Sequence, residues 1–184
     1  GASLKGLHPA RALNVGYRRA AGLFATPFAS DSFLSDEVFK FIAQEGLQTH
    51  RLYRLNRHDV EAGVLHKLDP EMTNLTDFLG GCGNVAGHCH APQDEELSGP
   101  LKLPLLHTNA AGDFLMVPTE VWHSMRGQPE KPDVSCLDTD SLSLHAAITH
   151  DLTEVRLPDA CKLFKLSHGA MHHKNVSAIW NSWS

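Results

Sequence analysis

The sequence has no long hydrophobic run and few cysteines, and each scarcity excludes a class of protein. No stretch approaches the run of about 20 apolar residues that a membrane-spanning helix needs. Four cysteines in 184 residues are too few for a disulfide scaffold. We therefore expect an intracellular protein of a reducing compartment, with no membrane partner.

Positive charge is also scarce, because 16 lysines and arginines stand against 21 aspartates and glutamates and leave a net charge of −5. This balance argues against a nucleic-acid partner, which would be bound by neutralising its phosphates. Low-complexity tracts and internal repeats are absent too. The composition, with 42% hydrophobic and 20% charged residues, is typical of a globular protein with one folded domain.

Residues 1–30 contain no acidic residue but include Lys5, Arg11, Arg18 and Arg19. Two interpretations of this basic N-terminal segment stay open. Its arginine-rich, acid-free composition fits an organellar targeting segment, and it also suits a basic helix packed on an acidic body, which we favour. We expect residues 31–184 to form the single domain.

The N-terminal part of that domain is expected to be mostly helical. "SDEVFKFIAQEG", residues 35–46, combines a capping Ser35, acidic residues in the first turn, one apolar face and a terminating Gly46. "THRLYRLNR", residues 49–57, fits a strand. A short helix is expected from Asp59, and Pro70 prevents it from continuing.

From residue 80 to residue 170 short apolar runs alternate with Gly, Pro, Asn and Asp, a pattern typical of β-structure. The runs are "LKLPLL", "DFLMVP", "SLSLHAAIT", "VRL" and "CKLFKL". In "SLSLHAAIT", residues 141–149, alternate positions are apolar as in a half-buried strand. The sequence therefore predicts an α+β fold in which an N-terminal helical segment packs on a small antiparallel β-barrel or sandwich.

"GHCHAPQDE", residues 87–95, contains three residues of the kinds that bind metal ions. His88 and His90 share a face if the segment is a strand, and a turn at Pro92 would bring Glu95 to the same face. Imidazole and carboxylate donors suit Fe(II), Mn(II), Ni(II) or Zn(II). We therefore predict one divalent metal ion bound by these three side chains and a fourth from elsewhere in the chain.

A second segment, "AGDFLMVPTEVWHSM", supplies the fourth donor. Gly112 and Asp113 form a turn, a buried strand follows as far as Val117, Pro118 ends it, and His123 comes five residues later. Together the two segments resemble the two motifs of the cupin superfamily, His-x-His-(x)4-Glu and Gly-Asp-(x)4-Pro-(x)4-His.

The cupin resemblance covers residues 81–126 and implies a barrel whose interior binds one metal ion. Carried over by position, the ligands are His88, His90, Glu95 and His123. The implied function is a mononuclear metal-dependent enzyme acting on a small molecule as an oxygenase or other oxidoreductase, an isomerase or a lyase. We expect His107 to serve as a catalytic acid or base, and Leu115, Val117 and Trp122 to exclude water around the ion.

The same region permits two other sites. Cys82 and Cys89 with the neighbouring histidines would make a structural zinc site, although their spacing is uncommon for one. Either cysteine with His107 and Asn109 would make a Cys-His hydrolase, which needs a thiol of lowered pKa.

A further alternative starts at "HRLYRLNR", residues 50–57. Its Leu-Tyr-Arg strand resembles the NAD-binding arginine strand of ADP-ribosyltransferase toxins, with Arg54 in that role. The resemblance implies an NAD-dependent effector domain. In that family the catalytic glutamate comes late in the sequence, and Glu154 would take this role. The residue that pairs with this glutamate in the family's motif is missing here. A non-catalytic interaction domain is the remaining alternative.

Overall fold

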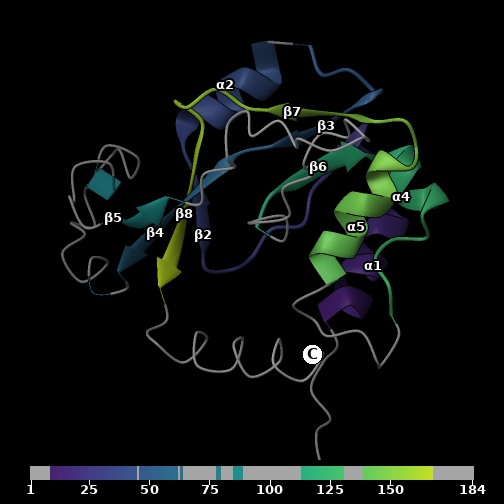
Figure 1. Ribbon diagram of the computed structural model, residues 1–184, viewed down its shortest axis with the longest axis horizontal. Helices are drawn as coiled ribbons and strands as arrows, with labels where there is room; N and C mark the ends of the chain where they lie inside the picture. Colours follow the sequence, from purple (N-terminus) through teal and green to yellow (C-terminus); the bar gives the residue numbers. More distant parts are fainter. Residues whose placement is uncertain are drawn as a thin grey trace, which may run out of the picture.

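A computed structural model describes residues 9–44, 46–61, 63, 78–79, 85–88, 113–130 and 139–167. Figure 1 shows two small sheets, with helices on both sides of the first of them. The elements are α1 (Pro9–Arg19), β1 (Phe24–Ala25), β2 (Ser32–Leu34), α2 (Asp36–Gln44), β3 (Arg51–Arg54), β4 (Asn56–Glu61), β5 (Val85–His88), β6 (Leu115–Pro118), α4 (Thr119–Ser124), α5 (Thr139–Ile148), β7 (Thr153–Arg156) and β8 (Lys162–Ser167).

The strands form two four-stranded sheets that share two chain segments. The strand order is β1-β6-β3-β7 in the first sheet and β2-β8-β4-β5 in the second. Only Leu55 separates β3 from β4, and residues 157–161 separate β7 from β8, so each segment passes from one sheet into the other. The two segments run parallel in both sheets, whereas all other strand pairs are antiparallel.

The predicted α+β class is confirmed, and the finer prediction of an antiparallel barrel or sandwich is not. Both sheets are mixed, and the strands that the structure describes do not close into a barrel. Parallel pairing is possible here because about 100 residues separate the two shared segments, which leaves room for the long connection that parallel strands need. No helix in the described part of the chain is long and apolar enough to cross a bilayer.

Helix α1 forms from the basic N-terminal segment and packs against α4. Pro9 occupies its first position, where a missing N–H costs nothing, and Arg18 and Arg19 lie in its last turn, where cations offset the helix dipole. Ala10, Asn14 and Tyr17 are buried at helical spacing. On the exposed side Arg11 and Arg18 lie near Glu130, at 3.8 and 4.0 Å.

Helix α2 confirms the helix predicted for residues 35–46. Ser35 directly precedes it, but its hydroxyl ties the helix to β8 by accepting from the Lys162 N–H over 3.0 Å and donating to the Ala160 carbonyl over 3.3 Å. Val38 is fully buried beneath the helix. Gly46 follows the helix with φ +60°, a conformation that glycine adopts without strain.

The first sheet is buried on both faces. Neighbouring residues of its central strands face opposite ways, so these strands contribute side chains to the core on each side. Leu115 and Val117 pack with Trp122 against the α1, α4 and α5 side, while Phe114 and Met116 pack towards α2. The strand predicted within "DFLMVP" is therefore confirmed as β6, and all four of its residues are buried. Leu115, Val117 and Trp122, expected around a metal ion, form part of this core instead.

Two predicted elements are wrong. "SLSLHAAIT" lies in helix α5, where Ser143, Leu144 and Ala147 are buried at spacings of three and four while Leu142 is exposed. Leu144, Ala147 and Ile148 also have the i, i+3, i+4 spacing of one helix face, so the apolar pattern did not decide between helix and strand. The helix expected from Asp59 does not begin there, because strand β4 continues to Glu61.

Candidate functional site

The structure locates two of the five residues predicted to act at a metal site. His88 ends β5, with its side chain outside the described part of the chain, and His123 lies in α4. His90, Glu95 and His107 lie outside the described residues. The shared metal ion therefore stays a prediction, as do the sites proposed for Cys82 and Cys89, which also lie outside the described residues.

His123 is placed differently from the expectation that it would follow a barrel strand. It projects from a helix, and its Nε2 lies 2.9 Å from the Tyr17 carbonyl. Because a carbonyl only accepts, Nε2 carries the proton and only Nδ1 keeps a lone pair that could bind a metal. Figure 1 shows α4 and β5 at opposite sides of the molecule. This arrangement separates His123 from the backbone that carries His88.

A different histidine lies opposite His88. In the second sheet Phe33 pairs with Phe164, Phe164 with His58, and His58 with His88. This row crosses all four strands and ends with His58 on β4 and His88 on the edge strand β5. We call it the Phe-Phe-His-His row.

His58 sits in an apolar setting on β4. Its residue is 8% exposed, and its ring centroid lies 5.8 Å from that of Phe164. Phe164 belongs to a small hydrophobic cluster with Val60 and Leu79, packed on by Phe33. The β4–β5 register shifts between His58 and Val60, which marks a bulge or irregularity of the kind often found beside functional sites.

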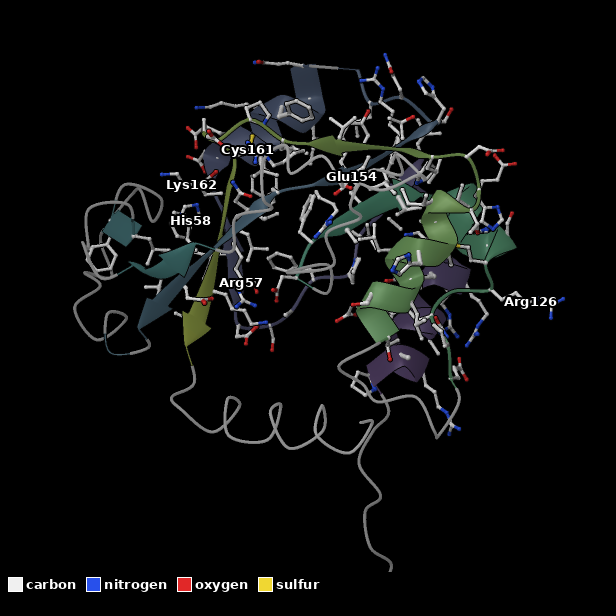
Figure 2. The ribbon with its side chains drawn as sticks, viewed as in Figure 1. Arg57, His58, Arg126, Glu154, Cys161 and Lys162 are labelled. Atoms are coloured by element: carbon white, nitrogen blue, oxygen red, sulfur yellow. The ribbon has the colours of Figure 1, made fainter. Side chains whose placement is uncertain are left out.

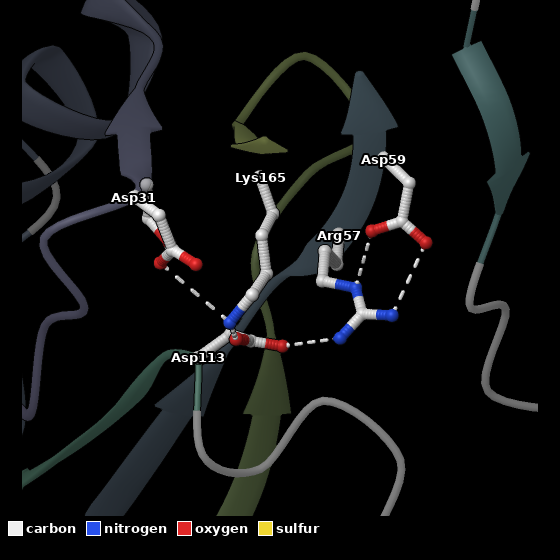
Figure 3. Close-up of polar contacts among 6 residues, drawn as sticks. Asp31, Arg57, Asp59, Asp113 and Lys165 are labelled. Carbon is white, nitrogen blue, oxygen red and sulfur yellow. Dashed lines mark hydrogen bonds and ion pairs between the residues drawn. The ribbon is translucent and has the colours of Figure 1, made fainter. Parts of the chain in front are cut away.

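Charged residues lie at alternate positions of β4, with Lys165 of β8 beside them. Arg57 donates to two carboxylates: its Nη1 reaches Asp113 Oδ2 over 2.8 Å, and its Nη2 reaches Asp59 Oδ2 over 3.1 Å (Figure 3). Lys165 donates to the other oxygen of Asp113 and lies 3.7 Å from Asp31. Asp113, which the sequence indicated only as a turn residue, thus links β6 of the first sheet to the second sheet.

One acid near this network has a shifted pKa. Burial, followed by the negative charge of Asp113, raises the pKa of Asp140 to about 6, while Lys165 acts in the opposite direction. Burial, and then the charge of Asp140, also raises the pKa of the Tyr17 hydroxyl above its usual range. Because its carboxylates are already paired with cations, the Asp113 network is suited to holding the two sheets together.

The two residues singled out for NAD chemistry are in contact. Arg54 Nη1 donates to Glu154 Oε1 over 2.8 Å, and the arginine side chain is 8% exposed. They come from the parallel strands β3 and β7, 100 residues apart in sequence. Figure 2 labels Glu154 on β7.

The sequence interpretation missed His58 because it ended the strand near Arg57. In "NRHDVE", successive side chains face the Asp113 network and the apolar cluster in turn. This period of two is typical of a strand and could have predicted that the strand continues past Arg57. Within the described residues no group of three or more His, Cys, Asp or Glu side chains is arranged to bind a metal ion.

The chain was compared with protein-family models, curated proteins and solved structures, and none of the three comparisons finds a match. The cupin and ADP-ribosyltransferase resemblances therefore rest on the motifs alone.

Proposed function

We propose that this chain is a metal-dependent enzyme acting on a small molecule, and that its metal ion is bound on the second sheet by His58 and His88. The observation that carries the proposal is their pairing between β4 and β5. Residues directly opposite in an antiparallel pair project to the same face, with Cβ atoms about 4.5–5.5 Å apart. Two imidazoles at that separation can share one ion.

The remaining ligands are proposed from the chain that directly follows β5. His90 and Glu95 were predicted as ligands from their spacing to His88 and stay in the set, whereas His58 replaces His123. Such a donor set suits Fe(II), Mn(II), Ni(II) or Zn(II). Phe164 beside His58 would limit water around the ion and strengthen its electrostatic effect on a substrate. Oxygenase, isomerase and lyase chemistry are all compatible with this set.

Metal content tests the proposal. Purified protein is analysed for bound transition metals by mass spectrometry, alongside His58→Ala, His88→Ala and His123→Ala. The proposal expects one equivalent of metal in the parent and in His123→Ala, and strong loss in the other two. Circular dichroism establishes that the variants are folded, and His58→Gln replaces His58→Ala if the latter is not. A parent without metal, or metal that persists in both strand variants, rejects the proposal.

The contact between Arg54 and Glu154 favours a second candidate, an NAD-dependent transferase. An arginine can bind the NAD pyrophosphate, and a carboxylate beside it can orient the ribose. This candidate predicts that NAD raises the melting temperature of the parent and not that of Arg54→Lys. Equal stabilisation of the two proteins, or none in the parent, removes it. A non-catalytic interaction domain remains if neither metal nor NAD binds.

A further inference from the structure

A pocket of about 480 Å³ lies between α1 and α4, away from the Phe-Phe-His-His row. Its walls include Tyr17 and Trp122, whose rings stack with centroids 4.1 Å apart and an interplanar angle of 8°. The Trp122 indole N–H donates to the Ala25 carbonyl over 3.0 Å, which fixes the ring in place. A rigid, largely apolar pocket of this size matches a small organic ligand.

Apart from Tyr17, the ionisable residues that line this pocket are all basic. They are Arg18 on α1, and His123 and Arg126 at the end of α4, and no carboxylate is among the described residues that line it. Arg18 has a distant partner in Glu130, at 4.0 Å. Figure 2 shows the Arg126 side chain extending outward from the end of α4. The pocket is therefore suited to an anion.

Arg126 occupies a backbone position where glycine is normally found. Its φ is +62°, and Gly127 follows with φ +77°. The Arg126 N–H donates to the His123 carbonyl over 3.0 Å, and the Gly127 N–H donates to the Trp122 carbonyl over 2.9 Å. This is the Schellman arrangement, in which the first of these two residues is usually glycine. An arginine there is strained, and strained residues of this kind cluster at functional sites.

The helix ends beside the pocket do not repel an anion as open helix ends would. The two Schellman hydrogen bonds occupy the Trp122 and His123 carbonyls. The Tyr17 carbonyl accepts from the Ala20 N–H over 3.1 Å and from His123 Nε2 over 2.9 Å. These hydrogen bonds reduce the negative charge that the helix ends present to an anion, and Arg18 and Arg126 oppose what is left.

We propose that the α1–α4 pocket binds an organic phosphate that carries an apolar ring. The guanidinium groups of Arg18 and Arg126 bind the phosphate with two parallel hydrogen bonds each. The ring of the ligand occupies the apolar part beside Tyr17 and Trp122. This site is independent of the proposed metal ion.

Isothermal titration with phenyl phosphate, inorganic phosphate and phenol tests the proposal on the full chain. Phenyl phosphate is expected to bind at least about ten-fold more tightly than the other two, because only it satisfies both the cations and the apolar wall. No binding of phenyl phosphate at millimolar concentration overturns the proposal. Equal binding of phenol or of inorganic phosphate overturns it as well.

The variant Arg126→Gly separates binding from folding. Glycine relieves the strain at this position, so the melting temperature is expected to stay the same or rise while phenyl phosphate binds about ten-fold or more weakly. Arg19→Gln removes a charge from the same last turn of α1, at a residue that does not line the pocket, and is expected to bind like the parent. Undiminished binding by Arg126→Gly, or equal weakening by Arg19→Gln, contradicts the proposal.

Discussion

Arg57 donates to Asp113 across the junction of the two sheets, with 2.8 Å between Nη1 and Oδ2. Lys165 donates to the other oxygen of the same carboxylate, so a single acid is held by two cations from β4 and β8. The Asp113 side chain is only 9% exposed. This contact connects the start of β6 to the sheet that carries the proposed metal site (Figure 3).

Removing this shared carboxylate should destabilise the fold. Asp113→Asn leaves two cations with fewer partners in a partly buried site, which is expected to lower the free energy of unfolding by about 2 kcal/mol. Asp59→Asn breaks the more exposed end of the network and is expected to cost under about 1 kcal/mol. Urea denaturation compares the two. Equal costs would show that Asp113 is not the centre of the network.

The raised pKa of Asp140 predicts a pH-dependent stability difference between the parent and Asp140→Asn. Below about pH 4 the carboxyl is protonated in both the folded and the unfolded chain and contributes no difference. Between about pH 4 and its folded pKa of about 6, the unfolded chain loses a proton that the folded protein keeps. The parent therefore loses free energy of unfolding across this window and stays less stable above it.

At pH 7 we expect Asp140→Asn to be about 1–3 kcal/mol more stable than the parent, and the gap to close by about pH 4. Thermal unfolding from pH 4 to pH 7 measures it. Asp159→Asn, at an exposed position, is the control and should follow the parent throughout. A gap that widens on acidification would contradict the assigned direction.

Two glycines should respond oppositely to alanine. A Cβ on Gly127 would lie 2.1 Å from Asn14 Oδ1, in a backbone with positive φ. That oxygen accepts from the Gln128 N–H, so Gly127→Ala should cost about 2 kcal/mol or more. A Cβ on Gly16, within α1, meets nothing within 4 Å, so Gly16→Ala should add about 0.5–1 kcal/mol. Chemical denaturation gives both values, and a harmless Gly127→Ala would refute the close packing of α1 on this turn.

The Tyr17 hydroxyl is buried without a hydrogen-bond partner among the described residues. Removing a buried, unpartnered polar group recovers its desolvation cost, so Tyr17→Phe should raise the free energy of unfolding by about 1 kcal/mol. The stacking on Trp122 is kept in this variant, which makes it preferable to a smaller residue. A loss of stability measured by thermal unfolding would instead indicate an ordered water bound to the hydroxyl.

The sequence predicted those elements in which the residues at the ends and the pattern of apolar residues indicated the same structure. Helix α2 has acidic residues in its first turn and a terminal glycine, and β6 is a short apolar run bounded by Asp113 and a proline. Helix α5 was missed because its apolar positions fit two periods equally well. Strand pairing could not be predicted, since register depends on contacts between segments far apart in sequence.

The candidate site shows the same limit. Spacing alone identified His88, but its partner across the strands, His58, lies 30 residues earlier and belongs to no motif with it. His123 fitted the second cupin motif by position, yet "TEVWHS" forms a helix whose histidine binds the Tyr17 carbonyl. Motif spacing specifies which residues are available, whereas the sheet register specifies which of them lie opposite one another.

The most direct test of the central claim is a zinc titration of the metal-free parent and of His58→Ala, His88→Ala, the double variant and His123→Ala. If the two strand histidines share one ion, each single change should weaken binding at least about 100-fold, and the double variant should be little worse than either. His123→Ala should bind like the parent. Weakening by His123→Ala as large as that by His88→Ala, or unchanged affinity in His58→Ala, would contradict the account.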